Sequence, residues 1–247
     1  MKLLAKLSLL LIASNGMAQE VTKTNLVPVI DGVAEYSVWQ GDDWYPLDKS
    51  IIGPLPDKND FSGRYKLRWD ENYLYLLAEI QDDVLFDAHP NPLNQYWDDD
   101  CLEVFIDEDA SGGDHLYNFN AFAYHIALDN QAVDIGEKDA KGNEQFILLN
   151  DHINSQWKRN QAAPHSVTWE VAIKLFNDQY SPSKKAESSR VRLTTNKKIG
   201  FMLAYCDNDG SKIREHFVGS HEIKPVNGDK NLGYKDASVF GVIQLVE

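Results

Sequence analysis

The sequence predicts an all-β protein: an antiparallel β-sandwich with a two-sheet architecture of the immunoglobulin-like or jelly-roll-like kind. Aromatic and β-branched residues recur with a period of two, whereas no segment shows the period of a convincing helix. The spacers between these segments are rich in Gly, Pro, Asn and Asp, which favour turns. Many short strands with polar connections are typical of an antiparallel sandwich.

The N-terminal segment, residues 1–18, has the pattern of a secretory signal peptide. Two lysines precede an apolar run, and a small-residue exit over 16–18 comes just before Gln19. The apolar run is too short to span a bilayer, and no later segment is long enough either. We therefore expect an exported protein, periplasmic or extracellular, in which residues 19–247 form a single domain.

The chain is acidic, with 38 Asp and Glu against 24 Lys and Arg and a formal net charge of -14. Nucleic acid and anionic membrane surfaces would repel such a chain, so neither is an expected partner. Neutral ligands and divalent cations are compatible with this charge. Cys101 and Cys206 both fall in predicted strands, and their pairing stays open because the sequence does not show whether these strands are neighbours.

The first clear element is a β-hairpin over residues 64–83, "RYKLRWDENYLYLLAEIQDD", with a turn at 70–72. The period of two divides its second strand into two faces. One face carries Tyr73, Tyr75, Leu77 and Glu79, and the other carries Leu74, Leu76, Ala78 and Ile80.

Further strands follow the hairpin along the chain. They are expected at 101–107, 117–127, 167–175, 199–207 and 242–246. The basic and polar stretch 182–198 is expected to be a long loop between strands.

An acidic run, "WDDDCLEVFIDED" at 97–109, surrounds one of these strands and raises the question of catalysis. Glu103 and Asp107 share a strand face, which places them roughly 13 Å apart. Paired glycosidase carboxyl groups lie about 5 to 9.5 Å apart, so this strand alone does not supply such a pair. A partner on another strand is not identified by the sequence, and no G-x-S-x-G nucleophile motif is present.

The sequence also contains side chains that can bind a metal. The seven histidines are scattered, without H-E-x-x-H or C-x-x-C, and nothing singles out a haem-ligating pair such as Met202 with a histidine. Oxygen-rich clusters favour Ca²⁺: Asp82 and Asp83 follow a strand end, and Asp107 precedes a turn. A structural calcium held by these three aspartates is expected, with the alternative that they merely solvate strand ends.

Aromatic residues are abundant, with 6 Trp, 11 Tyr and 10 Phe. Trp39, Trp69 and Trp169 sit in regular patterns and are expected in the core. Trp97 and Tyr234 lie in Asp- and Gly-rich surroundings, where exposure is expected. An exposed aromatic ring can stack on the apolar face of a sugar, while carboxylate and amide groups bind the hydroxyls.

The order of several segments resembles that of family 9 carbohydrate-binding modules, which occur attached to xylanases or alone. The resemblance covers nearly the whole of residues 19–247. It is carried by "IDGVAEYSVW", "LRWDENYLYLLAEIQDD", "HPNP", "DDCLEVFIDED", "VTWEVAIKL" and "VFGVIQL". It implies a β-sandwich that clamps a sugar, often at a chain end, between two aromatic side chains. It also implies structural calcium and no catalysis by the module.

Carried over residue by residue, the resemblance makes Glu103 the acceptor of sugar hydroxyls, Tyr234 one clamp aromatic and Asp82 a calcium ligand. Two positions depart from the family pattern. The first clamp Trp of the family directly follows P-N-P, whereas this chain offers Trp97 four residues later. The position of a sugar-binding Arg is taken by Asn120, which has a shorter side chain and no charge.

The sequence thus predicts non-catalytic binding of an oligo- or polysaccharide of the cellulose or xylan type, in the service of polysaccharide breakdown. The expected ligand-binding residues are Trp97, Glu103, Asn120 and Tyr234. Two alternatives stay open: a haem-binding electron-transfer domain of related sandwich fold, and a glycoside hydrolase.

Overall fold

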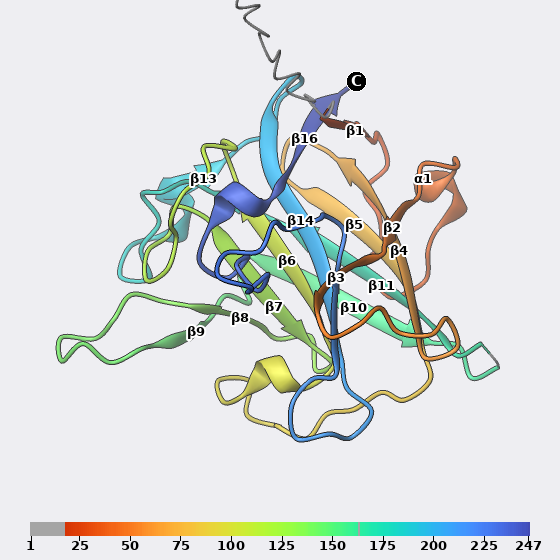
Figure 1. The fold of residues 1–247 in the computed structure, drawn as a ribbon. Helices are drawn as coiled ribbons and strands as arrows, with labels where there is room; N and C mark the ends of the chain where they lie inside the picture. The colour runs from red at the N-terminus through yellow and green to blue at the C-terminus, as the bar shows by residue number, and fades with distance from the viewer. Residues whose placement is uncertain (1–17, 163) are drawn as a thin grey trace, which may run out of the picture.

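A computed structural model describes residues 18–162 and 164–247 (Figure 1). The predicted signal peptide, 1–18, lies outside the described residues except for Ala18, and remains a prediction. The described chain forms two large β-sheets that pack face to face, and one separate pair of short strands, so the predicted sandwich is confirmed. Among the described residues, no helix combines the length and apolar character needed to cross a membrane.

The larger sheet contains nine strands. Its main path runs in the order β1 (Gln19–Thr22), β16 (Gly241–Val246), β14 (Lys198–Asp207), β6 (Cys101–Asp107), β7 (Phe122–Ala127), β8 (Ala132–Ile135) and β9 (Phe146–Leu148). β15 (His216–Gly219) pairs with β14 and with β3 (Lys49–Ile52). All these pairs are antiparallel except β1 with β16, which is parallel. The expected antiparallel pattern therefore has one exception, at the edge where the first and last strands meet.

The smaller sheet contains five strands and includes the predicted hairpin. Its order is β10 (Ile153–Arg159), β11 (Ser166–Ile173), β5 (Leu74–Asp82), β4 (Phe61–Trp69) and β2 (Tyr45–Leu47). The short strands β12 (Leu175–Phe176) and β13 (Arg190–Val191) form a separate pair. The helical segments are single turns: α1 (Tyr36–Trp39), η1 (Tyr96–Asp98), η2 (Ala186–Ser189) and η3 (Ala237–Val239).

Alternation along the strands places the core between the sheets. In β6, Leu102, Val104 and Ile106 point inward and belong to the same core cluster as the fully buried Trp69 and Trp169. Burying an aliphatic side chain of this size contributes roughly 1.5 to 3 kcal/mol. The residues between them, among them Glu103, therefore point to the outer face of the larger sheet.

The second face of the hairpin is buried as well, because α1 covers it. Tyr75 and Leu77 pack with Trp39 in a small cluster on the outer side of the smaller sheet. The Trp39 indole donates a hydrogen bond of 3.0 Å to Glu170 on β11, which fixes α1 to the sheet. All three tryptophans predicted for the core are thus buried.

Two segments differ in detail from expectation. The strand expected at 117–127 begins at Phe122, because Tyr117 has φ 64° and the chain before Phe122 forms turns. The stretch 182–198 is mainly loop, as expected, but contains η2 and β13. Residues 113–115, which precede these turns, lie beside the C-terminal loops that frame the outer face of the larger sheet.

Candidate functional site

A hollow of about 340 Å³ lies on the outer face of the larger sheet. Its floor is formed by Glu103 of β6 and His125 of β7, which stand directly opposite each other in the strand register. Its walls come from η1, from β8 and β9, and from the loop that precedes η3. In Figure 1 the β8–β9 hairpin extends to the left of the view, and η1 is the short yellow turn below β7.

Two aromatic side chains stand at the edge of this hollow. Trp97 of η1 and Tyr234 of the loop before η3 both line it, and both are partly exposed. Trp97 is held by edge-on packing against Tyr96, with ring centroids 5.0 Å apart, and by a tilted contact with Phe146 at 5.9 Å. The Lys235 ammonium lies 4.9 Å from the Tyr234 ring centroid. The rings are therefore supported by neighbours and still accessible.

The floor carries an ionised carboxylate. Burial by itself raises the pKa of Glu103, but a hydrogen bond with His125 and the charge of Arg214 outweigh it, so that its pKa lies below the ordinary value. Arg214 Nη1 lies 3.2 Å from Glu103 Oε1, and the Cys206 thiol donates to the same oxygen at 3.3 Å. Oε2 of Glu103 makes no hydrogen bond with described residues and is not sealed from solvent, so it is free to accept from a ligand.

A second carboxyl group in the wall has the opposite character. Asp134 of β8 is 4% exposed, and burial raises its pKa to about 8. Hydrogen bonds from the backbone N–H groups of Ala123 and Ile135 act against this shift and do not cancel it. At neutral pH Asp134 is therefore mainly a neutral acid, next to a floor that holds a negative charge.

A group of carboxylates gathers at a different place, where β5 and β14 end. Asp82, Asp207 and Asp209 have oxygens within 4.8 Å of one another, and Asp209 also belongs to a group with Asp60 and Asp83. Oδ1 of Asp82 and Oδ1 of Asp207 are buried without a hydrogen-bond partner among the described residues. Burial and neighbouring negative charges raise the pKa of Asp82 to about 6 and that of Asp207 to about 8. This group offers the oxygen ligands that a hard cation binds.

The structure brings together some predicted site residues and separates others. Trp97, Glu103 and Tyr234 line the same hollow, and Asp82 and Asp83 fall in carboxylate groups that share Asp209. Asp107 does not join them. Its side chain accepts a hydrogen bond of 2.7 Å from the Gly112 N–H. Asp107 ends β6, and the length of this strand, roughly 20 Å, separates it from the carboxylate group.

Asn120 lies outside the hollow, because its amide donates to the Gly112 carbonyl oxygen at 2.9 Å in the turns before β7. The polar side chain that β7 does present beside Glu103 is His125. His125 and Arg214 were not predicted as site residues. Alternation along "FAYHIALD" places His125 on one face, but only the strand register shows that this face is the floor of the hollow.

The two cysteines are free thiols, and their strands are neighbours. Cys101 of β6 lies directly opposite Cys206 of β14, and both are fully buried. The question that the sequence left open is thus answered in favour of proximity without a disulfide.

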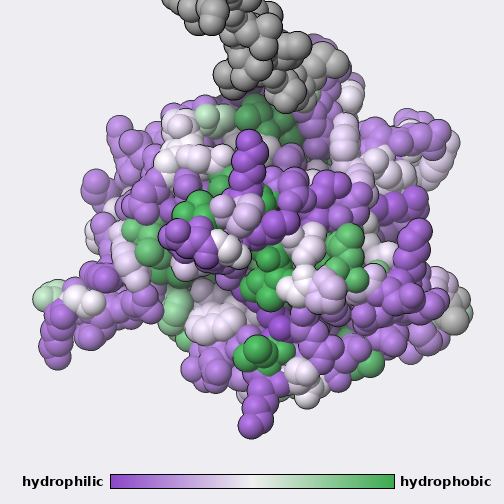
Figure 2. Space-filling model, in the orientation of Figure 1, coloured by the Kyte–Doolittle hydropathy of each residue, from purple (hydrophilic) through white to green (hydrophobic). Residues whose placement is uncertain are grey.

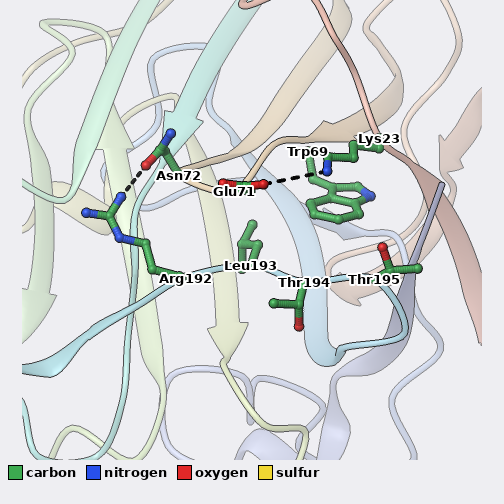
Figure 3. A pocket seen from close by; sticks show the side chains of 8 residues that line it. All are labelled: Lys23, Trp69, Glu71, Asn72, Arg192, Leu193, Thr194 and Thr195. Atoms are coloured by element: carbon green, nitrogen blue, oxygen red, sulfur yellow. Dashed lines mark hydrogen bonds and ion pairs between the residues drawn. The ribbon is translucent and has the colours of Figure 1, made fainter.

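A larger hollow of about 610 Å³ lies near the chain ends (Figure 3). Its only aromatic lining residue, Trp69, is fully buried, and the Lys23 ammonium lies 5.1 Å from its ring centroid. Lys23 is 3.9 Å from Glu71, and Arg192 hydrogen-bonds Asn72. This hollow lacks an accessible ring, so the smaller hollow is the better candidate for a ligand with apolar faces. The face seen in Figure 2 is mainly hydrophilic, with apolar residues in small separate patches.

A β-sandwich with accessible aromatic rings around an ionised carboxylate is the arrangement expected of a carbohydrate-binding module. The chain belongs to the carbohydrate family 9 binding domain-like family, whose model matches residues 30–247. The expected resemblance is confirmed, and the family favours carbohydrate binding over the haem-binding and hydrolase alternatives.

Known relatives and solved structures agree with this family. The chain is 27% identical over 220 residues to endo-1,4-beta-xylanase A of Thermotoga maritima, covering 89% of this chain but 17% of the xylanase. A family 9 module of Caldicellulosiruptor kristjanssonii in complex with cellotriose aligns with a TM-score of 0.63 at 20% identity, over 93% of both chains. A putative carbohydrate-binding protein of Bacteroides uniformis aligns with a TM-score of 0.57 at 13% identity, over 92% of this chain and 98% of that one.

The raised pKa of Asp134 predicts a pH dependence of stability. The folded protein holds the Asp134 proton up to about pH 8, whereas the unfolded chain releases it near pH 4, so stability falls as pH rises between these values. Asp134→Asn should remove roughly 1 kcal/mol per pH unit of this decline between pH 5 and 7.5. Urea unfolding at several pH values measures it. The exposed Asp178→Asn is the control and should follow the wild-type slope; an unchanged slope in Asp134→Asn contradicts the assignment.

Proposed function

We propose that the hollow over Glu103 binds a short β-1,4-linked glucose or xylose oligosaccharide, and that the module serves capture of cellulose- or xylan-type polysaccharide. The convergence of Trp97, Tyr234 and Glu103 on one accessible hollow carries the proposal. The cellotriose complex of the similar Caldicellulosiruptor module and the xylanase relatives support the ligand class.

The contacts of the hollow account for such binding in physical terms. The Trp97 and Tyr234 rings offer apolar planes for the C–H faces of a sugar, and Oε2 of Glu103 accepts from a hydroxyl. Asp134, as a neutral acid, can donate a hydrogen bond that an ionised carboxylate cannot. The volume of about 340 Å³ is near the lower end for ligand pockets, which favours a short segment of a chain.

The proposed biological role follows from the small share of its relatives that this module matches. In the Thermotoga maritima xylanase the matching region is 17% of the protein, so most of that chain lies in other parts. We infer that this module acts by holding polysaccharide while catalysis takes place elsewhere. Its affinity should be micromolar or weaker, because two stacked rings contribute about 1 to 3 kcal/mol each.

Removing either ring should weaken sugar binding without unfolding the protein. Trp97→Ala and Tyr234→Ala should each raise the Kd for cellotriose about 5- to 150-fold, as expected for the loss of one stacking contact. Isothermal titration calorimetry with cellotriose and with xylo-oligosaccharides measures the effect.

The matched control is Tyr36→Ala, because Tyr36 is 81% exposed and lies on α1, outside the hollow. It should bind as the wild type does. Absence of heat with every cello- and xylo-oligosaccharide tested, or wild-type affinity in the Trp97→Ala, Tyr234→Ala double variant, would refute the proposed ligand and site.

We also propose a structural calcium at the carboxylate group of Asp82, Asp207 and Asp209. Two buried oxygens without partners, on Asp82 and Asp207, support it, because an uncompensated buried carboxylate is costly unless a cation or a proton neutralises it. The ligands come from the ends of two sheets, β5 in the smaller and β14 in the larger. A cation here would tie the two layers together.

Calcium should therefore raise thermal stability. At a Ca²⁺ concentration 100-fold above the Kd, binding to the folded state alone adds about 2.7 kcal/mol, or roughly 5 to 10 °C in Tm. Differential scanning calorimetry with Ca²⁺ and with EDTA measures this shift. Asp209→Asn should reduce it, whereas Asp42→Asn, an exposed aspartate outside the group, should preserve it. Equal Tm values with Ca²⁺ and EDTA rule the site out.

Export is the third proposal, with the protein in the periplasm or outside the cell. The lysines, apolar run and small-residue exit of residues 1–18 support it. β1 begins at Gln19, directly after the expected cut, and pairs with β16, so cleavage there leaves the sheet complete. N-terminal sequencing of the protein recovered after secretion should read Gln19 first; recovery of an intact Met1 in the cell interior argues against export.

A further inference from the structure

Four side chains with sulfur, nitrogen and oxygen donors meet at the base of the hollow. Cys101 and Glu103 come from β6, Cys206 from β14 and His125 from β7. The register pairs Cys101 with Cys206 and Glu103 with His125, so the four residues project from adjacent strands on the same outer face. We call them the thiol cluster.

Three of the six donor-to-donor distances are close to those of a tetrahedral metal site. Cys206 Sγ lies 3.3 Å from Glu103 Oε1, Cys101 Sγ lies 3.2 Å from His125 Nδ1, and that nitrogen lies 3.5 Å from the same Glu103 oxygen. All four donors lie within 4.8 Å of one another. Bonds of about 2.0 to 2.3 Å from Zn²⁺ to N, O and S ligands require donor-to-donor edges of roughly 3.3 to 3.8 Å.

We propose that the thiol cluster binds a thiophilic divalent cation of the Zn²⁺ class. Four ligands from two cysteines, one histidine and one carboxylate complete a closed tetrahedral site. Sulfur and imidazole donors select such a cation over Ca²⁺, which the all-oxygen group at Asp82 suits better. The two metal sites therefore differ in chemistry, and they lie on opposite faces of β14, because Cys206 and Asp207 are consecutive residues of that strand.

The cluster can bind a divalent cation without a change in its net charge. Without a metal, Glu103 and Arg214 form an ion pair, burial raises the pKa of the Cys101 thiol, and the Cys206 thiol donates its proton to Glu103. When the cation binds, both thiols lose their protons to solvent and become thiolates. Two positive charges and two negative charges are then added, and the cluster stays neutral.

Arg214 acts as the outer partner of this site. Its Nη1 lies 2.9 Å from Cys206 Sγ and 3.2 Å from Glu103 Oε1, so it can donate to a bound thiolate and carboxylate. Its guanidinium is fixed on the other side by the Phe217 ring, 4.3 Å away. This positive charge compensates the third anionic ligand, which would otherwise leave the site with a net negative charge.

Cobalt is a suitable probe, because Co²⁺ in a tetrahedral thiolate site has intense visible bands and sulfur-to-metal charge-transfer absorption. The purified protein, reduced and freed of metal by a chelator, is titrated with Co²⁺ in the absence of sugar. We expect both absorptions to saturate at one equivalent and Zn²⁺ to displace them. Cys206→Ser and His125→Gln should weaken Co²⁺ binding at least about tenfold.

Asp209→Asn is the matched control, because it alters the carboxylate group and leaves the thiol cluster intact. It should give the wild-type cobalt spectrum. Circular dichroism of each metal-free variant establishes that it is folded; if a variant is not, metal analysis of the wild-type protein after dialysis must still show one retained Zn²⁺ per chain.

Three results would overturn the inference. They are a Co²⁺ complex without sulfur charge-transfer absorption, no Zn²⁺ retained by the reduced wild-type protein, and recovery of Cys101 and Cys206 as a disulfide in protein purified after export. Failure of sugar binding leaves the cobalt result unaffected, so the metal site and the proposed function are tested separately.

Discussion

The antiparallel register of β6 with β14 and β7 is the constraint on which the rest of the structure depends. It sends Leu102, Val104 and Ile106 into the core and Glu103 outward, beside His125. A slip by one residue would exchange these faces and place a carboxylate in the core. The small side chain of Ala123, next to Glu103 on the outer face, also lines the hollow and leaves room for it above the sheet.

The acidic residues of the chain have different structural roles, as the acidic run at 97–109 illustrates. Asp99 and Asp100 are buried and accept backbone N–H groups of the segment 86–89, so they fold that segment onto the sheet. Glu103 is compensated by Arg214. At the ends of β5 and β14, by contrast, Asp82, Asp207 and Asp209 lie close together, and two of their buried oxygens have no hydrogen-bond partner among the described residues. The charge of Arg159 opposes the rise in the pKa of Asp82 but does not cancel it.

The sequence predicted those features that alternation and turn residues specify locally. β6 has the expected bounds, and the hairpin of β4 and β5 turns where expected. Trp97, Glu103 and Tyr234 were assigned through family resemblance, and the structure brings them together. Features that depend on pairing between distant strands were not accessible. Short edge strands lack a clear period. Asn120, predicted to bind the ligand at the position of the family's Arg, donates to a backbone carbonyl oxygen instead, and Asp107, predicted as a metal ligand with Asp82 and Asp83, lies at the other end of its strand.

The two oxygens of Glu103 link the proposed sugar site with the thiol cluster beneath it. Oε1 is held by Arg214, Cys206 and His125, while Oε2 stays open to the hollow. A carboxylate that is fixed through one oxygen presents the other in a defined position, so a ligand hydroxyl meets an acceptor that loses little conformational freedom on binding. A metal ion at Oε1 would fix it further, since ligation replaces weaker hydrogen bonds. Weak stacking on two partly exposed rings is then directed by a rigid polar floor, which is how a small hollow can select a sugar over other flat, partly apolar molecules.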